Sequence, residues 1–453
     1  MIQRDLEKRL LAHLTHRAEH PNVALLEGAR QVGKTTLIES IRPKLDREIL
    51  YLNLEENSRA VYELNSCRDF ADFETYLATT HQFKGDGQRI LCIDEAQESS
   101  ALGGFVRFMK EKWQHTQVIL TGSSMTRIFG SETRFPVGRV TRFLLQPFSF
   151  REFLRCGKQE ELLACKDPPP FLHERLLKYV QSYLDVGGLP AVASAFFDQL
   201  NWRQLRRDLY LDYRSDFARI FSATEASLFD QCLRGVASNL GSPSKYTQMV
   251  RTTSALYRRV PDFLELLESW KLIYKSDTRG TRPEQKGFAP KRYLYDPGLA
   301  NDLRLTALPR IDILSSLDAA QRTPVGGIVE NVLATELVAL GQNLTGWKKG
   351  VNSSEVDFIY RMTMGDTIPI ECKASLVTRP RDTGGLAEYA ARHGSKLGVL
   401  VNLAMPGKLT TSTGLKVIHI PVYLIDRLAE IVEALCENTS NSTDSLGLTT
   451  HDN

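Results

Sequence analysis

The segment from Gly28 to Thr35 fits the phosphate-binding loop (P-loop) pattern G-x-x-x-x-G-K-[ST] without a mismatch. The apolar run Val23 to Leu26 before it predicts a buried parallel strand, and residues 36–41 after it predict the start of a helix. Glycines in such a loop allow backbone amides to surround an anion at a helix N-terminus. The pattern therefore predicts an α/β domain built on a parallel sheet, and it predicts ATP as the ligand.

The residues of this loop have separate expected roles. Lys34 is expected to reach the outer phosphates of ATP, and the hydroxyl of Thr35 is expected to hold Mg²⁺. A glycine-rich turn that binds nothing is the alternative, and the strand and helix on either side argue against it. The predicted nucleotide-binding residues are Gly28, Arg30, Gln31, Val32, Gly33, Lys34, Thr35 and Thr36.

A second strand, residues 89–94, ends in the acidic pair Asp94-Glu95. This is the usual appearance of a Walker B segment. We expect Asp94 to bind Mg²⁺ through its water shell and Glu95 to polarise the attacking water, because phosphoryl transfer depends on positioning and charge neutralisation. An Asp-Glu pair also begins many solvated loops, but its combination with the P-loop favours hydrolysis over binding alone.

Two further catalytic candidates follow in the chain. Ser123 ends a third strand, residues 117–122, which is expected between the other two, and it is a candidate sensor of the γ-phosphate or of water. An ordinary strand-to-turn transition is the alternative for this segment. Arg139 is a candidate arginine finger that would act on the ATP of a neighbouring subunit. Three other arginines compete for that role, namely Arg127, Arg134 and Arg142.

Composition limits the other possibilities. A chain of 453 residues is expected to form two to four domains, and a formal net charge of +3 gives no global electrostatic argument for nucleic acid. The seven cysteines and nine histidines show no metal-ligand or disulfide spacing. No apolar run reaches the length of a membrane span, and no signal peptide is evident. We therefore expect a soluble, cytoplasmic protein with no membrane partner.

Several motifs together resemble a known family. Besides the P-loop with Arg-Gln-Val at its centre, they are the Thr-Gly-Ser-Ser segment, residues 145–153, Gly-Gly-Leu-Pro at 187–190, the tyrosine-rich segment 209–217 and Tyr-x-x-Asp-x-Gly-Leu at 293–299. The chain is similar over nearly its whole length to bacterial and archaeal AAA+-type ATPases that carry a C-terminal domain of unknown function. One departure is Ser215, where the family usually has arginine; Arg214 is a candidate replacement.

The central part of the chain is expected to be mainly helical. Residues 171–224 are expected to form a helical lid or linker, and residues 225–300 a winged-helix-like domain with strands at 272–275 and 291–295. Basic residues of this region could contact DNA phosphates. A lid or packing role without DNA is the alternative.

Acidic residues with nuclease-like spacing lie in the C-terminal part. Glu330 lies on an expected helix, and Asp357, Glu371 and Lys373 lie on two strands that could form a hairpin. Period-two alternation places Glu371 and Lys373 on the same face. The set is similar to restriction-endonuclease-like PD-(D/E)XK domains, here expected over residues 322–436, which implies Mg²⁺ held by Asp357 and Glu371, assisted by Glu330 and Lys373. An exposed edge strand that binds no metal is the alternative.

These expectations combine into one main hypothesis. The chain is expected to be an oligomeric ATPase that uses ATP and Mg²⁺ to move along or remodel nucleic acid, specifically DNA. A ring is one form that this oligomer could take. Its C-terminal domain would grip or cut that DNA. The alternatives are an ATP-dependent signalling or defence switch that acts through protein partners, and an ATP-gated, Mg²⁺-dependent nuclease. Residues 1–155 would be the ATPase domain, and the polar tail 437–453 is expected to be disordered.

Overall fold

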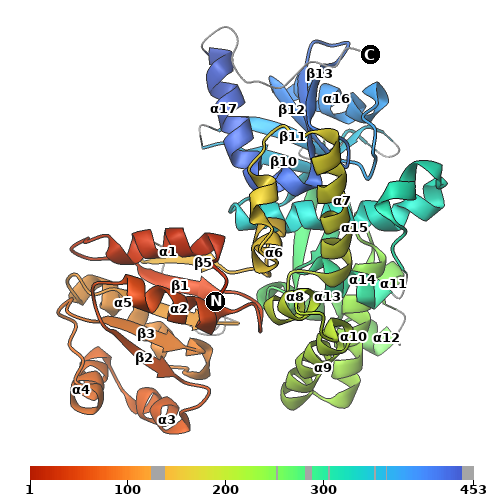
Figure 1. Ribbon diagram of the computed structural model, residues 1–453. Helices are drawn as coiled ribbons and strands as arrows, with labels where there is room; N and C mark the ends of the chain where they lie inside the picture. Colours follow the sequence, from red (N-terminus) through yellow and green to blue (C-terminus); the bar gives the residue numbers. More distant parts are fainter. Residues whose placement is uncertain are drawn as a thin grey trace. The chain divides into compact units, whose positions relative to one another are not determined.

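The computed structural model describes residues 1–123, 138–250, 254–280, 288–304, 307–350, 353–363 and 365–440, with side chains left out at 220, 254–255 and 436–440 (Figure 1). The chain divides into two compact units. Unit 1 contains residues 1–147 and 269–272, and unit 2 contains residues 148–268 and the chain from residue 273 onward. The domains expected at 171–224 and 322–436 lie within unit 2, as does the one expected at 225–300 except for residues 269–272.

A five-stranded parallel sheet forms the centre of unit 1. Its strands are β1 (Val23–Glu27), β2 (Ile49–Asn53), β3 (Ile90–Asp94), β4 (Val118–Gly122) and β5 (Val140–Leu144), in the order β2-β3-β4-β1-β5. The expectation that β4 lies between β1 and β3 is confirmed. Because the strands are parallel, their carboxyl ends meet at one edge of the sheet, where ligands of open α/β sheets bind.

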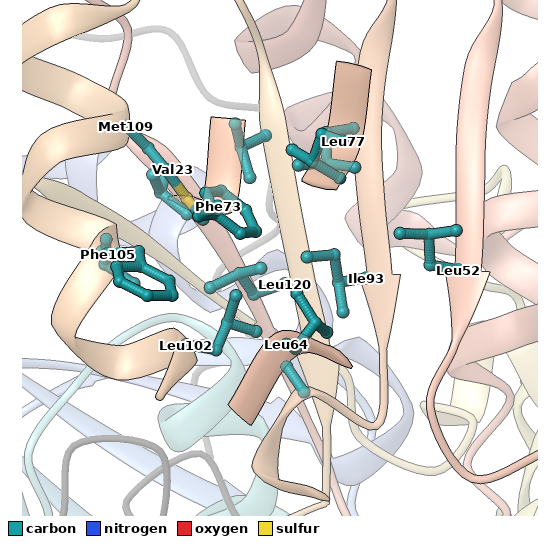
Figure 2. Packing of buried hydrophobic residues seen from close by; sticks show 14 of the residues in the cluster. Val23, Leu52, Leu64, Phe73, Leu77, Ile93, Leu102, Phe105, Met109 and Leu120 are labelled. Carbon is teal, nitrogen blue, oxygen red and sulfur yellow. The ribbon is translucent and has the colours of Figure 1, made fainter. Parts of the chain in front are cut away.

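Helices supply the rest of the unit 1 core. They are α1 (Asp5–Thr15), α2 (Lys34–Ile41), α3 (Ser58–Ser66), α4 (Phe70–His81) and α5 (Leu102–Lys112). Figure 2 shows side chains of the strands, such as Ile93 and Leu120, packed with Phe73 of α4 and Phe105 of α5. Each side chain of this size stabilises the fold by about 1.5–3 kcal/mol when fully buried. This packing holds β3 and β4 in place, and the carboxyl ends of these strands carry Asp94 and Thr121.

The first part of unit 2 is helical. Its helices are α6 (Phe150–Cys156), α7 (Pro170–Val186), α8 (Pro190–Phe197), α9 (Trp202–Ile220), α10 (Ala223–Ser238), α11 (Tyr246–Met249), α12 (Ser254–Tyr257), α13 (Val260–Ser269) and α14 (Pro297–Arg304). Arg214, the candidate replacement for the missing family arginine, lies on α9 with its Nε 3.9 Å from Asp230 Oδ1 on α10. Its contact is therefore between two helices of the same unit.

Two of the family motifs meet around one buried carboxylate. Asp296 is fully buried, and it accepts hydrogen bonds from the amides of Gly188 and Leu299, each at 2.7 Å. A Cβ on Gly187, whose φ is +86°, would lie 2.4 Å from Asp296 Oδ1, and a Cβ on Gly298 would lie 2.3 Å from the Val186 carbonyl oxygen. Only glycine fits at both positions, so these motifs join α7 and α14.

Unit 2 contains two sheets. The smaller one has the order β7-β6-β8-β9, from β6 (Ile273–Arg279), β7 (Lys291–Leu294), β8 (Thr345–Lys348) and β9 (Glu355–Val356). The strands expected at 272–275 and 291–295 are thus present as the antiparallel pair β6 and β7. However, β6 also pairs in parallel with β8, so the expected domain boundary at residue 300 does not separate these strands.

The larger sheet has the order β10-β11-β12-β14-β13. Its strands are β10 (Phe358–Arg361), β11 (Thr367–Cys372), β12 (Leu397–Asn402), β13 (Gly407–Thr410) and β14 (Lys416–Pro421). The pair β10 and β11 is antiparallel, which confirms the expected hairpin, whereas β11, β12 and β14 run parallel. Three helices accompany this region, namely α15 (Ala319–Ala339), α16 (Gly384–His393) and α17 (Leu428–Ser440).

The C-terminal helix and the length of the helices bear on two predictions from the sequence. Helix α17 continues to Ser440, past the expected start of the tail at 437, and residues 441–453 lie outside the described residues. Across the described parts of the chain, we find no helix with the length and apolar character needed to cross a membrane.

Candidate functional site

The P-loop joins β1 to α2 at the carboxyl edge of the unit 1 sheet. Its backbone is left-handed at Gln31, with φ of 63°, and at Gly33, with φ of 94°. A Cβ on Gly28 would lie 2.3 Å from the Leu145 carbonyl oxygen, so the loop must pass close to the end of β5. The left-handed backbone at Gly33 and the close approach to a carbonyl oxygen at Gly28 explain the two glycines of the pattern, because residues with a side chain rarely tolerate either constraint.

Lys34 points back into the loop that it terminates. Its ammonium is buried and donates hydrogen bonds to the carbonyl oxygens of Gly28 and Ala29, each at 3.1 Å. Burial lowers the pKa of Lys34, and the carboxylates of Glu95 and Asp94 partly oppose that change. A cation in this position is within reach of anionic oxygens bound by the loop amides.

Three hydroxyl groups converge on Asp94 at the end of β3. Thr35 Oγ1, from the first turn of α2, donates to Asp94 Oδ2 at 3.0 Å. Tyr51, from β2, donates to the same oxygen, and Thr121, from β4, donates to Oδ1. Burial and the hydrogen bond to Asp94 raise the pKa of Tyr51, so its hydroxyl stays protonated. The predicted partners Thr35 and Asp94 are therefore brought together.

Glu95 follows directly in a strained backbone conformation. Its φ is 50°, in the left-handed region, and its amide donates to Asp94 Oδ1 at 3.0 Å. The side chain is partly exposed, and its Oε2 accepts a hydrogen bond from Nε2 of the Gln97 side chain. Non-glycine residues adopt this conformation mainly where the surrounding structure enforces it, often at functional sites.

The other predicted nucleotide-binding residues lie on the P-loop and at the start of α2. Val32 is buried and its carbonyl oxygen accepts from Arg4 Nη1 at 2.8 Å, which anchors the loop to the start of the chain. Arg30 lies 3.8 Å from Glu55 through Nη2 and Oε1. Gln31 and Thr36 are exposed. Arg30, Gln31 and Thr36 thus lie on the loop beside Lys34 and Thr35, and Val32 anchors it.

The predicted sensor residue follows β4 at the carboxyl edge of the sheet, and the predicted finger residue lies at the amino edge. Ser123 is partly exposed just beyond β4, and it is Thr121 of the same strand that contacts Asp94. Arg139 precedes β5 at the amino end of the sheet, the end opposite the P-loop, and its Nη2 lies 2.8 Å from Glu111 Oε1. The structure therefore does not bring Arg139 to the ATP site of its own chain.

Arg142, one of the competing arginines, lies closer to the P-loop along the sheet than Arg139 does. It lies on β5, and its Nε is 3.8 Å from Oε1 of Glu27, the last residue of β1 before the loop. Its side chain is about half exposed. Arg127 and Arg134 lie outside the described residues.

The nuclease-like set of residues does come together in unit 2. The chain changes from one sheet to the other at Asp357, between β9 and β10, and the Cys372 amide of β11 donates to Asp357 Oδ2 at 2.9 Å. Lys373 donates to Glu371 Oε1, which confirms that these side chains share a face. Glu330 reaches the same cluster from α15, as its contacts with a common partner demonstrate.

That common partner is Lys291 of β7, which sequence reasoning did not select. Its ammonium lies 2.7 Å from Asp357 Oδ1, 3.0 Å from Glu355 Oε1 and 3.1 Å from Glu330 Oε1. Tyr293, two residues along the same strand, donates its hydroxyl to Glu330 Oε1 at 2.7 Å. Two alternate residues of one buried strand therefore enter the carboxylate cluster together.

The pKa values of the carboxyl groups in this cluster shift in opposite directions. Burial and the Asp357 charge raise the pKa of Glu330 to about 7 and that of Glu371 to about 8. Burial would also raise the pKa of Asp357, but the ammonium groups of Lys291 and Lys373 hold it below its ordinary value. In the described part of the chain, Glu371 Oε2 is a buried oxygen without a hydrogen-bond partner.

The two sites differ in how they suit Mg²⁺. At the P-loop, Thr35 Oγ1 and Asp94 Oδ2 offer adjacent oxygen donors, the kind of ligand that Mg²⁺ prefers. In unit 2, by contrast, three carboxylates already face the Lys291 ammonium. No group of three or more His, Cys, Asp or Glu side chains among the described residues is arranged to hold a metal ion. The unit 2 arrangement does not fit Mg²⁺.

Three family models match parts of the chain. Residues 20–154 match an AAA domain, residues 177–309 match a domain of unknown function (DUF8612), and residues 325–423 match another domain of unknown function (DUF4143). An uncharacterized protein of Haemophilus influenzae is 24% identical over 357 residues, which cover 75% of this chain and 79% of that protein. The family matches therefore extend through both units.

Solved structures give weaker matches. The Orc1 protein of Aeropyrum pernix, in complex with DNA, is 14% identical with a TM-score of 0.30, and the match covers 67% of this chain and 91% of that one. Cdc6p of Pyrobaculum aerophilum is 13% identical with a TM-score of 0.27, over 64% and 91%. These low scores do not establish a common overall fold. The P-loop, the parallel sheet and the family match at residues 20–154 support an AAA-type ATPase assignment for unit 1.

Proposed function

We propose that unit 1 binds ATP with Mg²⁺ and hydrolyses it. Lys34 would leave the loop carbonyls and contact the outer phosphates, and Thr35 and Asp94 would hold the ion. Bound Mg²⁺ supplies charge neutralisation for the phosphate oxygens. Glu95 would orient the attacking water and accept its proton, with Gln97 holding the carboxylate in place before that step.

One observation carries this proposal. Thr35 and Asp94 are separated by 59 residues, yet Thr35 Oγ1 lies 3.0 Å from Asp94 Oδ2. The contact joins the residue after Lys34 to the residue before Glu95. A phosphate-binding loop that merely happened to be rich in glycine would not place its hydroxyl against a buried strand-end carboxylate with a second acid next to it.

We further propose that this cytoplasmic ATPase works as an oligomer on DNA, and that unit 2 holds the DNA. The order of elements in unit 2 supports this idea. Helix α15 is followed, after β8 and β9, by the hairpin β10 and β11, then by α16 and the parallel strand β12, an order that is similar to restriction-endonuclease-like domains. The same architecture can hold DNA without cutting it. Arg139 and Ser123 remain proposed as interface and sensor residues of the assembled form.

The test measures ATP turnover of the full chain with and without duplex, forked and four-way DNA at low salt. Wild type is compared with Lys34→Ala and with Lys8→Ala, which alters an exposed lysine on α1. We expect turnover that DNA stimulates, lost in Lys34→Ala and kept in Lys8→Ala. Unchanged turnover in Lys34→Ala would contradict the ATP site.

Two outcomes would separate the DNA proposal from its alternative. Hydrolysis without any DNA stimulation or DNA affinity would reject the DNA part and keep the ATPase part. Slow turnover together with a nucleotide-dependent change in mass would instead support the signalling or defence switch. Light scattering at several ATP concentrations measures that mass.

A further inference from the structure

Lys291 occupies the centre of the unit 2 carboxylate cluster. Its side chain is only 4% exposed, and its ammonium contacts Glu330, Glu355 and Asp357. A lysine ammonium has three N–H donors and no acceptor. Three carboxylate oxygens at 2.7–3.1 Å therefore match its hydrogen-bonding capacity completely.

The distances identify the kind of cation that this cluster suits. They are typical of charge-assisted hydrogen bonds, whereas Mg²⁺ requires oxygens at about 2.0–2.1 Å in a near-octahedral shell. An ammonium and a divalent ion cannot share the position, because two like charges at such a separation repel strongly in a buried site. Either Lys291 or a metal ion can neutralise these carboxylates.

The fold keeps Lys291 in that position. Strand β7 is buried along its length and pairs with β6, and Tyr293 fixes it further through the hydrogen bond to Glu330. On the other side of the cluster, Glu355 is also held by Lys348 at 2.9 Å. The lysine is therefore part of a packed sheet rather than a mobile side chain at the surface.

We propose that Lys291 is the resident cation of this cluster and excludes divalent metal from it. Unit 2 then lacks a metal-activated water for phosphodiester cleavage, so it does not cut DNA by that chemistry. The inference concerns unit 2 alone, so it stands or falls independently of the ATPase proposal.

Metal binding by the full chain tests this proposal directly. Mn²⁺ is titrated without nucleotide and followed by electron paramagnetic resonance, in an Asp94→Asn background that removes the candidate ion ligand of unit 1. Lys291→Met is compared with Lys275→Met, which removes an exposed lysine on the neighbouring strand β6. We expect Mn²⁺ affinity to rise by more than about tenfold in Lys291→Met, since a buried like charge is removed, and to stay unchanged in Lys275→Met.

Whether the Lys291→Met variant needs a bound cation to fold can be measured. If Lys291→Met is unfolded in chelator, it should fold when Mn²⁺ is added, as followed by circular dichroism. If it does not, the double variant Lys291→Met/Glu355→Gln is measured in its place, because it removes one ionised carboxylate that faces Lys291 and keeps the predicted ligands Asp357 and Glu371. A folded single or double variant without new Mn²⁺ binding would overturn the proposal. The proposal would also be overturned if the Asp94→Asn protein, with Lys291 intact, bound Mn²⁺ and if Asp357→Asn abolished that binding.

Discussion

The buried carboxylate of Asp296 gives the sharpest prediction about the role of the family motifs in unit 2. The structure assigns these motifs to architecture, because Asp296 joins the Gly187-Gly188 turn to the start of α14. We expect Asp296→Ala to destabilise unit 2 without changing ATP hydrolysis chemistry in unit 1. A residue of a functional site would show the opposite pattern.

The size of the effect follows from the two hydrogen bonds. Asp296→Ala leaves the amides of Gly188 and Leu299 buried without acceptors, and each such loss costs about 1–3 kcal/mol. We therefore expect the free energy of unfolding to fall by about 2–6 kcal/mol. Asp296→Asn retains a single acceptor oxygen and should cost about half as much.

Urea denaturation followed by circular dichroism measures this change in the full chain. Asp312→Ala serves as the control, because Asp312 is exposed and its ion pair with Arg310 lies at the surface, so its loss should leave the urea midpoint unchanged. An Asp296→Ala protein with the midpoint of wild type would refute the architectural role. A stable Asp296→Ala protein that had lost ATP turnover would show that the motif is functional.

Three other predictions test particular contacts. Burial raises the pKa of Glu371 to about 8 from an ordinary value of 4.5, so the folded state binds this proton more tightly, and stability should fall as pH rises between these values. Denaturation at several pH values should show that fall in wild type and a flatter profile in Glu371→Gln. Tyr51→Phe removes a hydrogen bond to the Asp94 carboxylate, and we expect a loss of about 1.5–3 kcal/mol in chemical denaturation, with no loss as the contrary result. Gly28→Ala would place a Cβ 2.3 Å from a backbone oxygen and should weaken ATP binding in calorimetry, whereas Gly104→Ala on α5, with open space around the new Cβ, should not; equal effects would contradict the close approach.

The P-loop and the strand ends could be predicted because their signals are local. Apolar runs followed by Lys34-Thr35 and by Asp94-Glu95 specify strands with chemistry at their carboxyl ends, and a parallel sheet brings such ends together. The hairpin that carries Asp357 and Glu371 was predictable for a similar reason, since alternation and a short connection determine its register.

The partners that complete each site lack such signals. Tyr51 lies 43 residues before Asp94 on a strand with no motif, and only the sheet order places β2 beside β3. Lys291 lies 66 residues before Asp357, and it reaches the cluster because β6 pairs with both β7 and β8. Long-range strand pairing of this kind leaves no local pattern, so the sequence predicted a metal site where the fold places a lysine.

The role of Glu95 is tested most directly by separating ATP binding from ATP hydrolysis in Glu95→Gln. Calorimetry measures the affinity for ATP with Mg²⁺, and a single-turnover assay measures the rate of the chemical step. We predict unchanged affinity and a rate lower by about 10²–10⁴-fold, the contribution expected of a positioned general base. Hydrolysis by Glu95→Gln at the rate of wild type would contradict the assignment of unit 1 as an ATPase that uses this residue.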